Sequence, residues 1–190
     1  MAAAIVVAVL APTAAAAGTH TKASIYAPFA PSGAPTVHVV STVRGHCWTG
    51  SLAAARSDAW RCLSGNLIYD PCFSSPTAPG IVLCPASGPW SRRAVEIKLT
   101  AKLPTKYANP GEPSTIGLPW ALVTTSGWKC RLDTGATSVV QGRRANYACT
   151  GTNDWLWGDP SRRSDPWKIF VAPASANKLK RTVGIRSAWF

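Results

Sequence analysis

The chain has 190 residues, of which 46% are hydrophobic, and its 20 lysines and arginines against eight aspartates and glutamates give a formal net charge of +12. No segment after the N-terminus is apolar enough for a membrane helix, which needs about 20 such residues. The composition therefore predicts one basic domain of about 170 residues with a real hydrophobic core, and it favours anionic partners.

The N-terminus, residues 1–17, is rich in alanine and carries no charge, which is typical of an export signal. Its apolar run is too short to span a bilayer, and the small residues Ala15 and Ala17 predict cleavage before Gly18. The first basic residue is Lys22, so the usual basic start of a signal peptide is missing, and an apolar tail on a cytosolic protein is the alternative. We expect the mature protein to be secreted or associated with the cell wall.

Residues 18–36 are rich in Pro, Gly, Ser and Thr and follow neither hydrophobic period, which predicts a flexible linker. The domain that follows, residues 37–190, consists mostly of short segments rich in β-branched and aromatic residues and bounded by turn residues. These segments predict strands at Thr36–Val43, Ile81–Cys84, Val95–Leu99, Trp120–Thr124, Trp128–Leu132, Ser138–Val140, Asn146–Cys149, Trp155–Trp157, Trp167–Val171 and Thr182–Trp189.

Two tight turns predict hairpins, at Ser126-Gly127 and at Gln141-Gly142, because glycine supplies the positive φ that such turns require. The single helix candidate is Ser51–Leu63, where apolar residues recur near helical spacing and Gly65 is placed to stop the helix. A shorter helix capped by Ser57 is the alternative. The predicted fold is a single disulfide-stabilised antiparallel β domain, mainly β with one short helix.

Six cysteines lie downstream of the predicted signal, and an even count in an exported chain indicates disulfides. Pairing of neighbours is the simplest interpretation, although other connectivities stay open; it joins Cys47 to Cys62, Cys72 to Cys84, and Cys130 to Cys149. A zinc site is the alternative, but the chain has no CxxC pair and all three histidines precede Cys47. We expect neither a metal nor another cofactor.

Catalytic patterns are weak. The stretch Gly45-His46-Cys47-Trp48 resembles the surroundings of the nucleophile in papain-like proteases, but no histidine follows it to activate a thiolate. Asp154 and Asp159 are the best carboxylate pair for a hydrolase, with turn formation as the alternative. Asp58, Arg61 and Asp70 are interpreted as a structural ion pair. We therefore predict no catalytic residues.

Binding residues are suggested by charge and by aromatic content. The adjacent pairs Arg143-Arg144 and Arg162-Arg163 suit phosphate or carboxylate oxygens, while an evenly charged surface that only aids solubility is the alternative. Trp155 and Trp157 share one face of an extended segment and predict a platform for sugar rings, with core packing as the alternative. The candidate ligand-binding residues are Arg143, Arg144, Trp155, Trp157, Arg162 and Arg163.

Five stretches of the chain are Gly45–Ser51, Asp58–Cys62, Tyr69–Phe73, Cys84-Pro85 and Tyr147–Gly158. Together they resemble a group of secreted six-cysteine proteins of high-GC Gram-positive bacteria. The resemblance implies export, three disulfides and a β-rich domain, and it carries no activity. We expect a monomeric, non-enzymatic envelope or extracellular domain that binds an anionic cell-wall polymer or glycan rather than nucleic acid. A secreted hydrolase and a secreted enzyme inhibitor are the alternatives.

Overall fold

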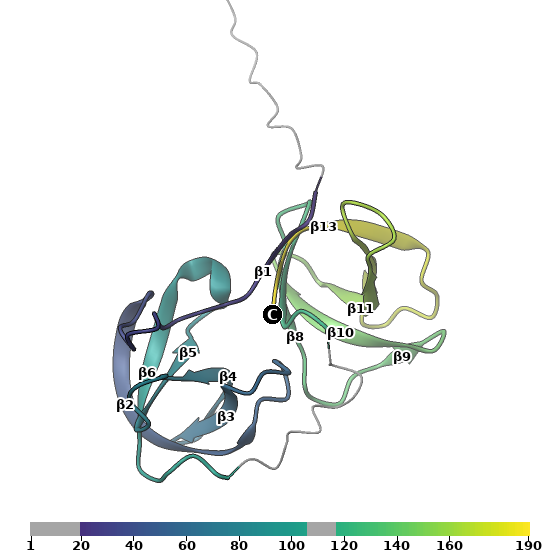
Figure 1. The fold of residues 1–190 in the computed structure, drawn as a ribbon. Coiled ribbons are helices and arrows are strands. Elements are labelled where there is room, and N and C mark those ends of the chain that lie inside the picture. Colours follow the sequence, from purple (N-terminus) through teal and green to yellow (C-terminus); the bar gives the residue numbers. More distant parts are fainter. Residues whose placement is uncertain (1–19, 106–116) are drawn as a thin grey trace, which may run out of the picture.

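The first of two β-barrels is built from consecutive strands in the N-terminal half of the chain (Figure 1). The computed structural model describes residues 20–105 and 117–190, so the signal peptide predicted for residues 1–17 lies outside the described residues. Neighbouring strands pair antiparallel, and β2 pairs parallel with β6 to close the barrel. The five strands are β2 (His38–Gly50), β3 (Ala59–Ser64), β4 (Leu67–Ser74), β5 (Ile81–Pro85) and β6 (Arg93–Leu99).

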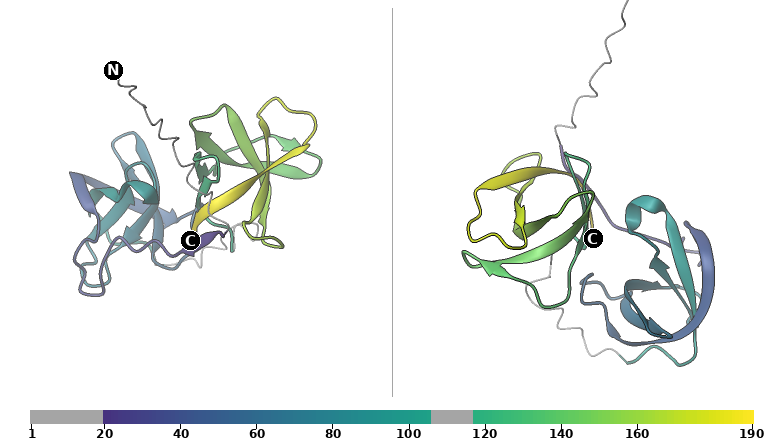
Figure 2. Two further views of the ribbon diagram at one scale, coloured as in Figure 1. Left: turned by 90° about the horizontal axis from the view of Figure 1, so that it is seen from above. Right: turned by 180° about the vertical axis from the view of Figure 1, so that it is seen from behind.

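The second barrel lies beside the first, as both views in Figure 2 show. Its strands pair antiparallel, and β13 pairs with β7 to complete the circuit. The strands of this circuit are β7 (Ala121–Thr124), β8 (Lys129–Leu132), β10 (Arg143–Thr150), β11 (Asp154–Ser161), β12 (Lys168–Pro173) and β13 (Arg181–Trp189). Two short strands add to it: β9 (Val139–Val140) pairs with β10, and β1 (Lys22–Ser24) pairs parallel with β13.

The predicted fold class is confirmed, since the protein is mainly β and disulfide-bonded. Each predicted strand coincides with a strand of the structure, and both predicted hairpin turns are present. In the turn between β9 and β10, Gln141 and Gly142 both have positive φ, of 50° and 71°, the conformation that a two-residue hairpin loop needs. The neighbour pairing of all six cysteines is also confirmed.

The helix predicted at Ser51–Leu63 is wrong. Among the described residues the only helical element is a 3-10 turn at Pro89–Ser91, and no helix there is long and apolar enough to cross a membrane. Residues 51–58 form a loop instead, and β3 begins at Ala59. Cys62 lies directly opposite Cys47 on β2 and is bonded to it, so the disulfide and the strand pairing override the helical spacing of the apolar residues.

The segment predicted as a flexible linker is tied to both barrels over its described part. Residues 22–24 form β1 on β13, and Tyr26 is buried between the barrels. The Tyr26 ring centroid lies 5.3 Å from that of Phe73 in the first barrel and 5.5 Å from that of Trp120 in the second. One anchoring aromatic and a three-residue strand are too short to show a hydrophobic period, which explains the miss.

The same contact forms the centre of the largest core cluster. This cluster contains buried residues of the first-barrel strands and of the second barrel together, so the two barrels share a continuous hydrophobic core. A smaller cluster fills the first barrel around its disulfides, and another surrounds Trp157 in the second barrel. The shared core fixes how the facing surfaces of the two barrels meet.

Candidate ligand-binding cleft between the barrels

Two prolines shorten the ladder between β4 and β5 in the first barrel, beside a cleft that the second barrel also lines. Strands β4 and β5 pair only at Phe73–Leu83 and Ser74–Val82. Continued two residues further, this register would set Pro71 opposite Pro85, and proline has no N–H with which to continue a ladder. Strand β5 ends at Pro85 while β4 extends back to Leu67. A cleft of about 720 Å³ opens here.

Both barrels contribute walls to this interbarrel cleft, which is within the size range of small-ligand sites, roughly 300 to 1,000 Å³. One wall is the start of β4 together with the chain that follows β5. The other wall is the outer surface of β8 and the end of β10. Aromatic side chains lie on both sides: Tyr69 and Trp90 in the first-barrel wall, and Trp120 from the residue before β7.

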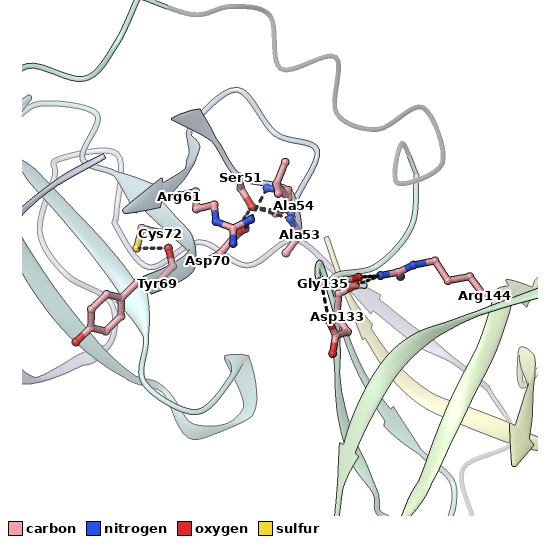
Figure 3. A network of polar contacts seen from close by, with 11 residues as sticks. Ser51, Ala53, Ala54, Arg61, Tyr69, Asp70, Cys72, Asp133, Gly135 and Arg144 are labelled. Atoms are coloured by element: carbon pink, nitrogen blue, oxygen red, sulfur yellow. Dashed lines mark hydrogen bonds and ion pairs between the residues drawn. The ribbon is translucent and has the colours of Figure 1, made fainter. Parts of the chain in front are cut away.

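Asp70 is the buried acidic group of the first-barrel wall (Figure 3), with only 8% of its side chain exposed. The Ser51 hydroxyl donates to one carboxylate oxygen, the Leu52 N–H donates to the other at 3.2 Å, and Arg61 Nη1 lies 3.9 Å from the same oxygen. Burial raises the pKa of Asp70, because desolvation outweighs these hydrogen bonds and the Arg61 charge.

Of the predicted ion-pair group, Arg61 and Asp70 do come together, whereas Asp58 pairs with Arg56. The Ser51 hydroxyl oxygen also accepts the N–H groups of Ala53 and Ala54, at 3.1 and 2.9 Å. The loop that replaces the predicted helix is therefore folded around Ser51 and supports the Asp70 side of the cleft.

The opposite wall carries basic side chains. Along β8, Lys129 and Arg131 are exposed, whereas Cys130 and Leu132 are buried. Because side chains alternate between the two faces of a strand, both cations point to the same side. Both line the cleft. Within the described part of the chain, neither forms an ion pair. They are therefore available to an anionic group from outside.

Arg143 and Arg144, predicted as ligand-binding residues, line a separate cavity of about 530 Å³ in the second barrel. Arg144 donates to the backbone oxygens of Asp133 and Gly135, at 2.7 and 2.6 Å, so its guanidinium holds the chain after β8 in place (Figure 3). Arg143 stacks on Phe170, with 4.7 Å from its Cζ to the ring centroid. Asp133 and Asp159 also line this cavity and offset the two positive charges.

Arg162 and Arg163 do not line either of these two cavities. Arg162 donates to the Gly117 backbone oxygen and lies over the rings of Trp167 and Phe190, at 4.7 and 5.3 Å. The structure thus gives Arg144 and Arg162 intramolecular partners, and it does not bring the two arginine pairs to one cavity.

The tryptophan platform is wrong for one of its two members. Trp157 is fully buried and its indole N–H donates to the Ala172 backbone oxygen at 3.0 Å. Trp155 is half-buried and packs against the same small cluster. Trp155 and Trp157 do share one face of β11, but that face packs against other side chains and is not an open surface.

Asp154 and Asp159, the carboxylate pair considered for a hydrolase, have different partners. Asp154 pairs with Arg181 at 3.1 Å, and Asp159 accepts a hydrogen bond from Asn146 at 3.2 Å in the cavity beside Arg144. Within residues 20–105 and 117–190, no three His, Cys, Asp or Glu side chains gather as they would around a metal ion. Neither observation supplies a reactive centre.

The cleft residues cannot be recognised from the sequence, because their proximity depends on the docking of two barrels. Two local signals do exist in the sequence. The alternation in Lys129-Cys130-Arg131-Leu132 indicates a strand with both cations on one face, and Pro71 and Pro85 indicate where a strand ladder ends. Comparisons of the chain with protein-family models, with curated proteins and with solved structures find no match.

Proposed function

We propose that this protein is an exported, non-enzymatic domain of the cell envelope or extracellular space that binds an anionic ligand in the interbarrel cleft. The observation that carries this proposal is the pair of exposed cations, Lys129 and Arg131, which face the cleft without an ion-pair partner among the described residues. The two acidic residues that line the cleft have other partners. Asp70 is paired with Arg61, and the Asp133 carboxylate accepts the Gly135 N–H at 2.7 Å.

Three further features support the proposal. The net charge of +12 would attract an anionic polymer over distances of about one Debye length, roughly 8 Å at physiological salt. The half-buried rings of Tyr69 and Trp90 would contact apolar groups of the ligand. The disulfides fit a protein that works in an oxidising compartment.

The magnitudes favour a polymer over a small anion. An exposed charge pair contributes about 0.2 to 1 kcal/mol, so Lys129 and Arg131 alone would hold a single anion only weakly. A wall polymer presents many charges and can contact other basic side chains of the +12 surface while it occupies the cleft, which raises the apparent affinity. We therefore expect tight retention on anionic wall polymer and weak binding of its repeating unit.

The test replaces both cleft cations, Lys129→Ala with Arg131→Ala, and measures retention on isolated cell walls across a salt series. Lys168→Ala with Arg186→Ala is the matched control, because these exposed residues of the same barrel give the same change in net charge away from the cleft. We expect the cleft variant to lower the salt concentration needed for release and to reduce the slope of log affinity against log salt by up to about two.

The control should change both quantities less. Equal losses in the two variants would mean that total charge, rather than the cleft, retains the protein on the wall. Unchanged retention of the cleft variant at every salt concentration would overturn the proposal.

A further inference from the structure

The start of β4 is a free strand edge inside the interbarrel cleft. Leu67, Ile68 and Tyr69 pair with β3 on one side. On the other side no described strand pairs with residues 67–70, because the ladder to β5 reaches only Phe73 and Ser74. In an antiparallel ladder every second residue directs its N–H and C=O away from the partner strand. These backbone groups of β4 are therefore offered to the cleft.

We infer that the part of the anionic ligand that occupies the cleft is an extended acidic peptide, which adds as a strand to the free edge of β4. This inference rests on the proposed function and specifies the ligand. Strand addition provides affinity through main-chain hydrogen bonds, while the side chains around it provide selectivity. A sugar polymer has no regular series of amides with which to pair along a strand.

The opposite wall fits the acidic side chains of such a peptide. Lys129 and Arg131 are two residues apart on β8, so their side chains are spaced by about 7 Å, which is also the spacing of alternate side chains on one face of an extended peptide. Carboxylates at alternate positions could therefore meet both cations. Arg131 can in addition form a forked pair with a carboxylate.

The mouth of the cleft also carries apolar side chains that are exposed to water at a cost. Leu67 and Ile68, at the tip of the β3–β4 hairpin, are 63% and 55% exposed and line the cleft. Leu67 and Ile68 are successive residues of β4 and point to opposite faces, so an apolar side chain of the added strand would cover the one that shares its face. A peptide in which acidic and apolar residues alternate would therefore meet the cations on one face and an exposed apolar side chain on the other.

The experiment uses the full mature protein and a capped hexapeptide of alternating glutamate and valine, with binding measured by calorimetry and tryptophan fluorescence. Two further peptides have the same sequence but carry N-methyl groups on every second amide, in either register, which blocks one backbone edge and keeps the charge. We expect at least one of them to bind about tenfold more weakly or worse. A lysine–valine peptide should bind to the Lys129→Glu, Arg131→Glu protein and not to the parent.

Three outcomes separate the two proposals. If both methylated peptides bind within about twofold of the parent peptide, strand addition is overturned while anion binding stands. If isolated wall polymer binds through Lys129 and Arg131 but the acidic peptide does not, the ligand is not a peptide and the inference is again overturned. If neither wall polymer nor acidic peptide binds, both proposals fail.

Discussion

The two barrels stabilise their interiors in different ways. In the first barrel, four of the seven buried residues of the core cluster are the cysteines Cys47, Cys62, Cys72 and Cys84. The second barrel has one disulfide, and its interior is filled by large side chains such as Tyr147 and Leu156. A small five-stranded barrel has little apolar area to bury, so disulfides supply part of its stability.

The largest effect should follow loss of both first-barrel disulfides. Replacing Cys47, Cys62, Cys72 and Cys84 by alanine removes two loop closures, each of about 3 kcal/mol, from a typical total of 5 to 15 kcal/mol. We expect the first barrel to lose amide protection at room temperature while the second keeps part of its own. Hydrogen exchange followed by mass spectrometry measures both barrels in one experiment.

The control is the second-barrel pair, Cys130→Ala with Cys149→Ala, which should cost only about 3 kcal/mol and leave both barrels folded. If the Cys130→Ala, Cys149→Ala variant loses as much stability as the variant with four first-barrel substitutions, the first barrel does not depend on its disulfides more than the second does.

The strands can be predicted where local sequence and tertiary packing agree. Ile81–Pro85 and Arg181–Trp189 are rich in β-branched and aromatic residues, and the sequence predicts both. Strands β3 and β4 are missed because their surroundings contain alanines at helical spacing and a proline at position 71. Strand β3 depends on its pairing with β2, and β4 depends on its pairing with β3, and a local pattern contains neither pairing.

The site is harder to predict than the fold for a related reason. Adjacent arginines look like an anion site in the sequence, but a guanidinium can equally bind backbone oxygens or stack on rings, as Arg144 and Arg162 do here. The residues that form the cleft come from β4 and β8, which are distant in sequence. The shared core around Tyr26 helps to bring these strands to face each other.

Trp157 offers a test of the second barrel. Trp157→Ala removes a fully buried ring and its hydrogen bond to Ala172, and we expect it to cost about 3 to 5 kcal/mol. Trp155→Ala, at a half-buried position on the same strand, is the control and should cost less than half as much. Urea unfolding of both variants supplies the free energies. Equal losses would show that the two rings contribute to the core alike.

Arg56 tests the coupling between the barrels. Its Nη1 donates to the backbone oxygens of Tyr26 and Phe190, while Nε and Nη2 bind Asp58 at 2.9 and 2.6 Å. Because a hydrogen bond from a charged group is worth about 1.5 to 3 kcal/mol and Arg56→Ala removes several, the variant should lose at least about 2 kcal/mol and separate the unfolding of the two barrels. The measurement is calorimetry, in which one transition should broaden or divide.

Arg56→Lys keeps the charge but loses the forked geometry, so it should recover only part of the lost stability. Full recovery by lysine would mean that the charge alone, without the bonds to Tyr26 and Phe190, couples the barrels.

The smallest effect concerns the charge of Asp70 in the wall of the cleft. Burial raises the pKa of Asp70 above its ordinary value, so between that value, about 3.9, and the raised one the folded protein binds more protons than the unfolded chain. The contribution of Asp70 to stability is therefore largest in acid and is lost as the pH rises through this window.

Asp70→Asn cannot titrate, so the free energy of unfolding of the parent protein should fall relative to that of the variant as the pH rises from 3 to 7, an interval of roughly four pH units around the window. Urea unfolding of both proteins at each pH measures the difference, in which the other carboxyl groups cancel. If the parent instead becomes more stable than the variant as the pH rises, the attraction of Arg61 outweighs burial. The Asp70 carboxyl would then have a pKa below its ordinary value.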